Sequence, residues 1–578
     1  MAGLGRTVTA RHRMARMWAL GDRVKPASYT PGLVISNVEE FDVNWAPFLT
    51  TGDGSIPRSI TLESRAPFAP WENSENGPKL IAKIGHVLPP SLDEADAGEV
   101  ASKDQLLPIS WQSMNHDTEL LSEELKPHVV VLTDALQLAN RPGKLVEAIH
   151  VIKTKFPGAL LWTPGIGGPD NCAVLAWFGV DLFDTTRSQQ AESHGAILTW
   201  AGPRMKGDFE PEFSHWESAL AEVRFALENN SLRELAQAQS LNSPKLIEHM
   251  RNHDKLISKK TGILSQVVEN KTTLRVNNLE SHDDAIILDW VDFIENRYRR
   301  PESLDEVLIL LPCSARKPYS ASRSHKYFRN AINHNSAHEV MVTSPLGLVP
   351  RDIETVWPAG YYDIPVTGDW AESELTRIQN MLLALISNNS YRVVINHSGI
   401  DLKCPIPVID TKQGYKATSD EALELLSTAV SKNMQKKRRG GEKMNLDNFR
   451  SVARFHHKND SWLDRTEIKG RFPRWKIMKS GEQIAMWAPE RGGFSISKAG
   501  IPYLKQHNSL KSISIKEGIK WKGDINLANL ETFDSSIRAG EDLLVMQGAE
   551  CVGTARATAP AWEWKGTPGR LAKMHQRL

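Results

Sequence analysis

The chain has 578 residues, of which 40% are hydrophobic and 24% are charged, a composition typical of globular proteins. That length exceeds what one hydrophobic core holds and predicts about three to four domains. No apolar run approaches the roughly 20 residues of a membrane span. The four cysteines form no CxxC pair, which argues against a disulfide framework or a structural zinc site. We therefore expect a cytoplasmic protein with no membrane partner, no metal and no cofactor.

The formal net charge of +1 conceals two oppositely charged parts of the chain. From residue 431 to the end there are 28 Lys and Arg against 15 Asp and Glu, a net charge of +13, which leaves −12 on residues 1–430. A basic tail on an acidic body predicts a polyanionic partner bound by the tail. The alternative is simply two differently solvated domains.

Residues 1–270 alternate short apolar strands with helical segments. Residues 129–134, 159–162 and 180–184 have the composition of buried strands, and residues 144–154 place their apolar side chains on one face of a helix. Alternation of this kind predicts parallel strands and, at this length, admits a (β/α) barrel.

Residues 271–430 read as a small doubly wound sheet. Strands are expected at 307–311, 340–343 and 391–395, with helices near 324–335 and 372–387 between them. Right-handed crossovers would make these strands parallel. Each strand is followed by polar residues, and the carboxyl edge of such a sheet is where ligands bind. The sequence therefore predicts an active site where the three strand ends converge.

The loop that follows the first of these strands concentrates reactive side chains. Pro312 ends the strand because it lacks an N–H group for the ladder, and Cys313 comes next. A cysteine is nucleophilic only as a thiolate, whose formation Arg316, Lys317, His325 or a helix amino terminus would favour. Ser324 is a candidate N-cap for the following helix. The alternative is that Cys313 is only a small buried apolar residue.

Several catalytic classes are excluded because the sequence has no P-loop, no G-x-S-x-G elbow and no H-E-x-x-H helix. Residues 165–168 (Gly-Ile-Gly-Gly) are only a weak dinucleotide signal. Beyond residue 430, a basic and glycine-ended run over 431–441 marks a domain boundary. A strand, turn and strand over 543–553 predict a small β-barrel at the end of the chain.

The reactive loop matches the pattern Pro-Cys-x3-Lys-Pro-Tyr-x2-Ser-x2-His from Pro312 to His325. A second stretch, Thr-Ser-Pro-Leu-Gly-Leu-Val-Pro-Arg-Asp over residues 343–352, continues through residues 362–370. Together they resemble archaeosine synthase, a family of archaeal tRNA-modifying enzymes related to tRNA-guanine transglycosylase. The amino-terminal part resembles the transglycosylase-like barrel of that family. Residues 536–542 and 552–555 resemble a PUA domain, which is an RNA-binding β-barrel.

The resemblance implies an α/β multidomain fold with four domains. These are a degenerate transglycosylase-like (β/α) barrel at 1–270, a small doubly wound α/β catalytic core at 271–430, a basic linker and small tRNA-binding domain at 431–497, and a PUA β-barrel at 498–578. Two features depart from transglycosylases: the zinc-ligand cysteine cluster is absent, and Asp134, Asp181 and Asp184 near strand ends are as well explained by structural capping as by catalysis. The barrel is therefore expected to be a scaffold or a tRNA-docking body.

The resemblance further implies a transferase that acts on tRNA carrying 7-cyano-7-deazaguanine in its D-loop. The nitrile receives an amine from free lysine, and a partner radical-SAM protein converts the product to archaeosine; a homodimer is one option. Alternatives are glutamine as the donor, a transglycosylase that inserts the base, and a non-catalytic PUA-type RNA-binding factor.

The residues expected to carry this function fall into three groups. The catalytic group is Cys313 as a nucleophile that forms a thioimidate, His325 as a proton donor, and Lys317 as the residue that lowers the thiol pKa or binds the donor carboxylate. A second version makes Cys313 structural, with Lys317 and the serines orienting the amine for direct addition. The remaining candidates are Ser314, Tyr319, Ser320, Ser322, Ser324, Ser344, Arg351 and Asp363 for substrate binding, and Lys436, Lys437, Arg438, Arg439, Arg474, Arg538 and Arg556 for tRNA phosphates.

Overall fold

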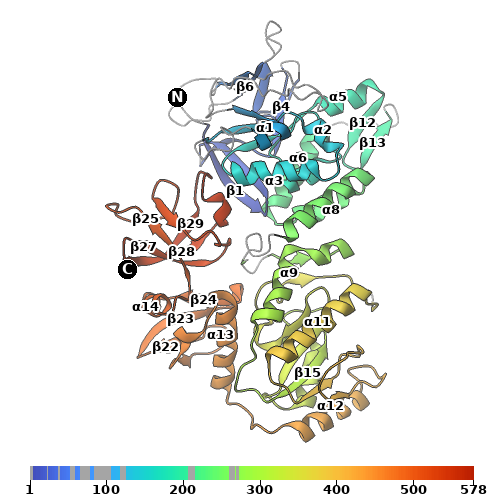
Figure 1. The fold of residues 1–578 in the computed structure, drawn as a ribbon, viewed down its shortest axis with the longest axis vertical. Helices are drawn as coiled ribbons and strands as arrows, with labels where there is room; N and C mark the ends of the chain where they lie inside the picture. Colours follow the sequence, from blue (N-terminus) through green and yellow to red (C-terminus); the bar gives the residue numbers. More distant parts are fainter. Residues whose placement is uncertain are drawn as a thin grey trace. The chain divides into compact units, whose positions relative to one another are not determined.

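The computed structural model describes residues 4–22, 24–36, 39–51, 59–65, 79–83, 106–116, 125–205, 215–259, 267, 272–366 and 368–578. The chain divides into two compact units (Figure 1). The first comprises residues 1–259, 526–528 and 562–571, and the second comprises residues 260–525, 529–561 and 572–578. The fold is mixed α/β and multidomain, as the sequence predicts. The bounds of the four predicted domains stay predictions.

The first unit contains one mixed sheet of eight strands, hydrogen-bonded in the order β7-β6-β5-β4-β11-β10-β9-β8. The series from β5 to β8 is parallel, and β6 and β7 are added antiparallel. Because this hydrogen-bonded order has two ends, a closed (β/α) barrel is not confirmed. The strands are β4 (Gly32–Ile35), β5 (Phe48–Thr51), β6 (Ser59–Ser64), β7 (Lys79–Lys83), β8 (Leu106–Ile109), β9 (Val129–Leu132), β10 (Leu160–Trp162) and β11 (Leu182–Asp184).

The first unit also contains helices, a three-stranded sheet and a two-stranded sheet of β12 (Ala196–Thr199) and β13 (Gly202–Met205). The predicted helix over 144–154 is present as α3 (Lys144–Lys155), and the strands β9 and β10 that flank it are fully buried, as expected for parallel strands covered on both faces. The other long helices are α4 (Cys172–Phe178), α6 (His215–Glu228), α7 (Leu232–Ser240) and α8 (Pro244–Ser258), and the three-stranded antiparallel sheet is β1 (Arg6–His12), β2 (Ala15–Gly21) and β3 (Pro26–Tyr29).

Two of the aspartates near strand ends in this unit have structural roles. The Asp181 carboxylate accepts hydrogen bonds from Lys153 Nζ at 2.8 Å and Trp18 Nε1 at 3.0 Å. The Asp184 carboxylate accepts bonds from Trp162 Nε1 at 3.2 Å and from the backbone N–H of Gly165 at 2.9 Å. These partners hold both carboxylates in the interior and explain their positions without a catalytic role.

The second unit is built on a five-stranded sheet in the order β17-β16-β15-β19-β20, and only β17 runs antiparallel. Helices α10 and α12 pack on one face, and α9 and α11 pack on the other. The predicted doubly wound sheet is therefore present. Its strands are β15 (Val307–Pro312), β16 (His338–Thr343), β17 (Gly347–Pro350), β19 (Val393–Asn396) and β20 (Val408–Asp410), and its helices are α9 (Ala285–Asp292), α10 (Arg323–Ile332), α11 (Glu372–Asn388) and α12 (Asp420–Asn433).

The order of the strands locates the switch point of the sheet, which is where open α/β sheets bind their ligands. From β15 the chain crosses to β16 on one side, and the later strands β19 and β20 add on the other side. The switch point therefore lies between β15 and β19, where the loops that follow two parallel strands diverge and leave a crevice. Cys313 is the first residue of the loop after β15.

The rest of the second unit includes helix α13, a four-stranded sheet and a five-stranded sheet, beside a two-stranded sheet of β14 (Leu274–Arg275) and β18 (Tyr362–Asp363). Helix α13 (Gly441–His457) packs against the strands β21 and β24 through an aromatic core that includes Phe449, Trp487 and Phe494. The predicted strand, turn and strand over 543–553 is confirmed as the antiparallel pair β27 and β28. The strands are β21 (Glu467–Lys469), β22 (Lys476–Lys479), β23 (Glu482–Ala488), β24 (Gly493–Ile496), β25 (Lys511–Ile515), β26 (Leu530–Phe533), β27 (Asp542–Gln547), β28 (Glu550–Ala557) and β29 (Ala572–Arg577).

Two kinds of feature are absent from the described residues. None of their helices combines the length and the apolar character needed to cross a bilayer. Nor do three or more His, Cys, Asp or Glu side chains come together there as a set that could hold a metal ion.

Candidate active site at the carboxyl edge of the second sheet

The loop after β15 brings Cys313 and Lys317 to the expected edge of the sheet. Both side chains are half-buried, and Cys313 packs against the core beneath the sheet. The Lys317 ammonium lies 4.0 Å from the centre of the Tyr362 ring, within the range of a cation–π contact. The strand β18 (Tyr362–Asp363) supplies that ring from a distant part of the sequence.

Three hydroxyl groups form a buried triad beside this pair. The Tyr319 hydroxyl donates to Thr343 Oγ1 at 3.3 Å, the Tyr362 hydroxyl and Thr343 Oγ1 are 2.5 Å apart, and the two tyrosine hydroxyls bond to each other. Burial raises the pKa of both tyrosines, so the hydroxyls stay protonated. Thr343 and Tyr362 belong to the second stretch that carries the family resemblance, but neither was predicted as a site residue. The available signal was that Thr343 is the last residue of a predicted strand.

Burial moves the pKa values of the two reactive groups toward each other. It raises the pKa of the Cys313 thiol, and the hydrogen bond from Thr343 and the charge of Lys317 only partly oppose this. It lowers the pKa of Lys317, which Asp363 and Cys313 partly restore. A less acidic thiol beside a less basic amine is an arrangement in which one proton passes readily between the two groups. Asp363 itself is exposed to solvent.

His325 is fully buried and is held as a neutral imidazole. Its Nδ1 atom accepts a hydrogen bond from Arg351 Nη2 at 2.9 Å, which places the ring proton on Nε2. Burial, and then the charge of Arg351, lowers the pKa of His325 to about 3. The ring lies against Tyr319 and Phe328, with centroids 5.4 Å and 5.2 Å away. A histidine in this position supports the loop and is poorly suited to exchange protons near neutral pH.

The burial of His325 should make folding sensitive to acid. Its folded pKa lies below the ordinary 6.5, so its contribution to stability is complete above pH 6.5 and falls by about 1.4 kcal/mol per pH unit as pH decreases toward the folded value. We expect His325→Asn, whose amide oxygen can still accept from Arg351, to lose less stability than the wild type between pH 7 and pH 5. Denaturant unfolding of both proteins at the two pH values measures this difference. Equal losses would show that His325 is not the buried neutral group described here.

Arg351 is the centre of a charged cluster beneath the loop. Its guanidinium donates to Glu339 Oε2 at 2.7 Å and 3.0 Å and to Glu354 Oε2 at 2.8 Å, in addition to His325. Although burial opposes it, the two carboxylates hold the pKa of Arg351 above its ordinary value. Glu354 also accepts from the backbone N–H of Ser320 at 3.2 Å. Arg351, predicted as a substrate ligand, is placed as the residue that fastens the loop to the sheet.

The predicted serines divide between structural and open positions. Ser322, not Ser324, is the N-cap of α10, because its Oγ accepts from the backbone N–H of His325 at 3.2 Å. Ser324 Oγ lies 3.2 Å from Ser322 Oγ. Ser344 donates to Glu374, whereas Ser314 is half-buried next to Cys313. Ser314 is therefore the predicted serine that directly follows Cys313 in the chain.

The strand end after β19 is closed by its own hydrogen bonds. His397 is buried, with Nδ1 2.9 Å from Thr411 Oγ1 and Nε2 2.8 Å from the carbonyl oxygen of Ala417. Asn396 accepts from Ser398 Oγ at 2.7 Å and donates to the carbonyl oxygen of Ile400 at 2.9 Å. The polar groups at the third predicted strand end are therefore engaged within the protein, and the reactive pair comes from the loop after β15.

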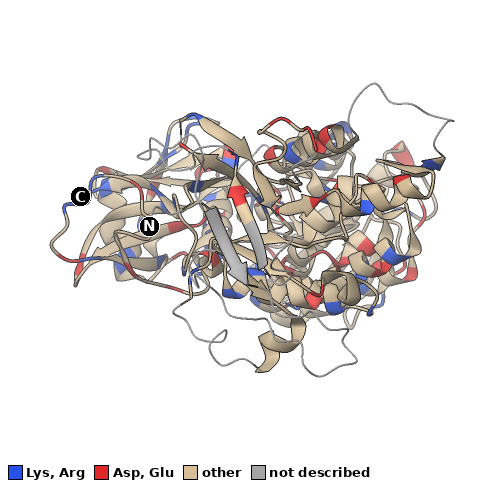
Figure 2. Cartoon of the chain, turned by 90° about the horizontal axis from the view of Figure 1, so that it is seen from above, with Lys and Arg blue, Asp and Glu red and all other residues tan. Residues whose placement is uncertain are grey.

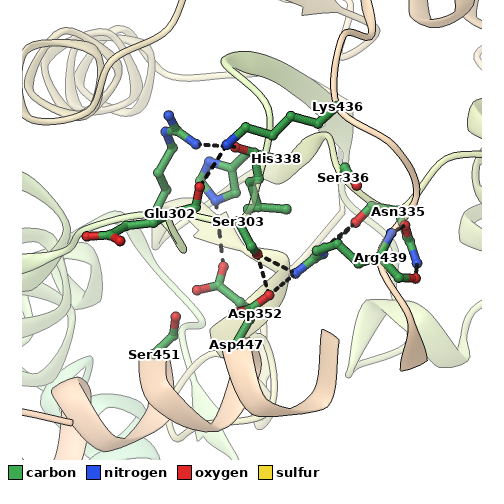
Figure 3. A network of polar contacts seen from close by, with 12 residues as sticks. Glu302, Ser303, Asn335, Ser336, His338, Asp352, Lys436, Arg439, Asp447 and Ser451 are labelled. Atoms are coloured by element: carbon green, nitrogen blue, oxygen red, sulfur yellow. Dashed lines mark hydrogen bonds and ion pairs between the residues drawn. The ribbon is translucent and has the colours of Figure 1, made fainter. Parts of the chain in front are cut away.

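The basic run after α12 is anchored along its length, as Figure 3 shows for Lys436 and Arg439. Lys436 Nζ donates to the carbonyl oxygens of Glu302 and Leu304 at 2.8 Å and 2.6 Å. Arg439 donates to Asp447 at 2.7 Å and to the carbonyl oxygen of Asn335 at 2.8 Å. Both cations bond to groups of the same chain, and their role as phosphate contacts stays a prediction.

The other predicted phosphate contacts are either paired or exposed. Arg538 pairs with Glu541 at 2.7 Å, and Arg556 pairs with Asp542 at 3.1 Å. Lys437, Arg438 and Arg474 are exposed. Basic and acidic residues are interspersed along the described chain (Figure 2). Among the predicted phosphate contacts, the exposed cations are therefore a few separate residues and do not form one continuous basic surface.

Comparison with known proteins gives matches over most of the chain. An archaeosine synthase subunit alpha from Methanosarcina acetivorans is 28% identical over 491 residues, which are 75% of this chain and 77% of that protein. The subunit of the same name from Thermoplasma acidophilum is 25% identical over 445 residues, which are 75% of this chain and 84% of that protein. The resemblance to archaeosine synthases is confirmed. Residues 287–430 also match the family model of a domain of unknown function, DUF5591.

Two solved structures are similar to parts of the chain. A crystal structure of a protein of unknown function has a TM-score of 0.40 and 21% identity, and covers 50% of this chain and 98% of that one. A conserved PUA domain protein from Thermoplasma acidophilum has a TM-score of 0.17 and 19% identity, and covers 19% of this chain and 75% of that one. The DUF5591 match spans the whole five-stranded sheet that holds Cys313 and Lys317.

Proposed function

We propose that this protein is a tRNA-modifying transferase that makes the amidine precursor of archaeosine. The observation that carries the proposal is the pair of Cys313 and Lys317 beside the hydroxyl triad at the switch-point crevice. The names of the relatives support archaeosine synthesis on tRNA. The substrate is then 7-cyano-7-deazaguanine in the D-loop of tRNA, and the reacting bond is its nitrile.

In the covalent version of the reaction, Lys317 acts as the base in its neutral form. It takes the proton of the Cys313 thiol, the thiolate attacks the nitrile carbon, and the nitrile nitrogen takes the proton back from the Lys317 ammonium to give a thioimidate. The incoming amine then adds to the same carbon, a proton moves from that amine to the sulfur, and the carbon–sulfur bond breaks. The products are a substituted amidine and the original thiol, so atoms and protons balance.

This version changes the role expected of His325. A buried imidazole with a pKa of about 3 is a poor donor of a proton at neutral pH. Lys317, whose pKa burial lowers and whose charge acts on the Cys313 thiol, is the better proton carrier. His325 and Arg351 hold the loop in position, while the hydroxyls of Tyr319, Thr343 and Tyr362 are placed to donate to the developing charge on nitrogen.

The amine donor and the partner protein are further parts of the proposal. Free lysine is the donor that the family resemblance implies, with glutamine as the alternative, and a radical-SAM protein would then cleave the lysine adduct. The relatives' name, subunit alpha, agrees with a partner subunit. The PUA-type role of the last sheet in binding tRNA and the cytoplasmic location also stay predictions.

Mass spectrometry of the modified base tests the proposal directly. tRNA carrying 7-cyano-7-deazaguanine is incubated with the protein and one amino acid at a time. We expect a gain equal to the whole mass of lysine, because addition to a nitrile expels no group, and no gain with the other amino acids. A gain with glutamine alone would identify that donor instead. Exchange of labelled guanine, or tRNA binding without any mass change, would favour a transglycosylase or a non-catalytic RNA-binding factor.

A further inference from the structure

The hairpin that joins β21 and β22 carries an exposed aromatic ring in a run of cations. Residues 469–476 read Lys-Gly-Arg-Phe-Pro-Arg-Trp-Lys, with four basic residues, two aromatic residues and no acidic residue. Phe472 is 69% exposed. Arg471 and Arg474, which flank it, are exposed as well. Single exposed apolar side chains are common in proteins, so the surroundings of Phe472 decide whether it has a function.

The tip of this hairpin is held rigidly. The backbone N–H of Arg474 donates to the carbonyl oxygen of Arg471 at 2.8 Å and closes the turn. Gly470 has φ +99°, and a Cβ atom there would lie 2.7 Å from the carbonyl oxygen of Arg474, so only glycine fits. The Phe472 ring packs edge-on against Trp475, with centroids 5.5 Å apart, and Trp475 packs in turn against Phe449 of α13 at 5.7 Å. These contacts support the Phe472 ring in the orientation that the structure shows.

The charges at the base of the hairpin are arranged at a cost to the fold. Lys469 and Lys476 are direct cross-strand partners, and both are exposed. Like charges directly opposite each other destabilise a sheet. Lys469 has a nearby carboxylate, Glu467, at 3.4 Å. An anionic partner bound at the hairpin would offset the remaining repulsion, so the cations indicate a polyanion rather than an apolar partner.

We propose that this hairpin binds an unpaired nucleotide of the tRNA, with the base stacked on Phe472 and the neighbouring phosphates contacted by Arg471 and Arg474. An aromatic ring accepts any base on its π-face, and flanking cations track the backbone, which is how proteins bind single-stranded nucleic acid. The inference rests on the proposed function, since it takes tRNA as the substrate. The hairpin would then bind a part of the tRNA that has opened locally. Such opening is required because the target base lies inside the folded tRNA elbow.

Binding measurements on variants of Phe472 test the proposal. The probes are full-length unmodified tRNA and a short single-stranded RNA that contains 2-aminopurine, whose fluorescence changes when it stacks. Phe472→Ala should weaken binding of both probes by roughly tenfold and abolish the fluorescence change, and Phe472→Trp should restore both. Phe472→Leu, which keeps an apolar side chain without a ring, should not. Phe225→Ala is the matched control, because that ring is 62% exposed on α6 and should leave binding unchanged.

The salt dependence of binding separates stacking from charge. Arg474→Ala should reduce the slope of log affinity against log salt by roughly 0.7 to 1 unit, whereas Phe472→Ala should lower affinity without changing the slope. Wild-type affinity in Phe472→Ala, or full rescue by Leu, would overturn the proposal, the latter in favour of an apolar protein contact. If the wild type binds tRNA through Phe472 but never alters the mass of the cyano base, the hairpin assignment stands and the proposed enzymatic function fails.

Discussion

Cys313→Ala is expected to lower turnover of cyano-modified tRNA by at least about 10³-fold, because removing a catalytic nucleophile removes the whole covalent route. The substitution is small and the side chain is only half-buried, so the fold should survive. The measurement is the rate of amidine formation under single-turnover conditions. Acid quenching should also trap a covalent adduct between protein and tRNA in the wild type and none in the variant.

Cys404→Ala is the matched control for this variant. Cys404 is likewise half-buried and follows β19, the neighbouring strand of the same sheet, so it controls for loss of a thiol near the crevice. Its activity should equal that of the wild type. Full turnover in Cys313→Ala would refute the thioimidate and leave the direct version, in which Lys317 and the hydroxyl triad orient the amine for addition to the nitrile.

Arg351→Met is expected to destabilise the second unit by about 3 kcal/mol, since it leaves two carboxylates, Glu339 and Glu354, facing each other without their cation. The side chains are 21%, 15% and 5% exposed, which places the cost at the low end of the range for broken buried pairs. Denaturant unfolding measures the effect. Adding Glu354→Gln to the variant should recover part of the loss because one of the unpaired charges is removed.

Arg323→Met provides the reference for this experiment. Arg323 lies on the exposed side of α10, over the ring of Tyr327, and its loss should cost less than about 0.5 kcal/mol. A loss below 1 kcal/mol in Arg351→Met would mean that the charged cluster does not hold the loop. Turnover should fall in Arg351→Met even at temperatures where the protein is folded, because the loop that carries Lys317 loses its attachment through Glu354 and Ser320.

The position of the reactive loop was predictable from the sequence, and the partners of its residues were not. An apolar run that stops at Pro312 locates a strand end, and alternation with helices predicts parallel strands. These two signals together predict that Cys313 lies at the carboxyl edge of the sheet. Burial and pairing depend on distant segments. From the sequence, His325 is interpreted as a proton donor. In the structure it is buried by contacts with Arg351 and with the rings of Tyr319 and Phe328.

The partners of the basic run and the choice of cap residue also could not be read from residue type. Lys436 and Arg439 look like ligands of a polyanion, but their donors point at carbonyl oxygens and a carboxylate of the same chain. Ser322 and Ser324 are equally good cap residues by type, and only the backbone conformation selects Ser322. Closure of the predicted barrel depends on pairing between the first and last strands of a sheet, which composition does not encode.

The strand that carries Tyr362 sets the boundary of the smallest fragment that contains the site. Among the described residues, β18 pairs with β14 (Leu274–Arg275) alone, in a two-stranded sheet with Leu274 opposite Tyr362. The triad therefore depends on residues that precede the DUF5591 match at 287. A fragment cut at residue 287 would keep Cys313, Lys317 and the whole five-stranded sheet. It would nevertheless leave the backbone of Tyr362 without its ladder partner. The catalytic module is therefore longer at its amino end than the sheet on which its chemistry lies.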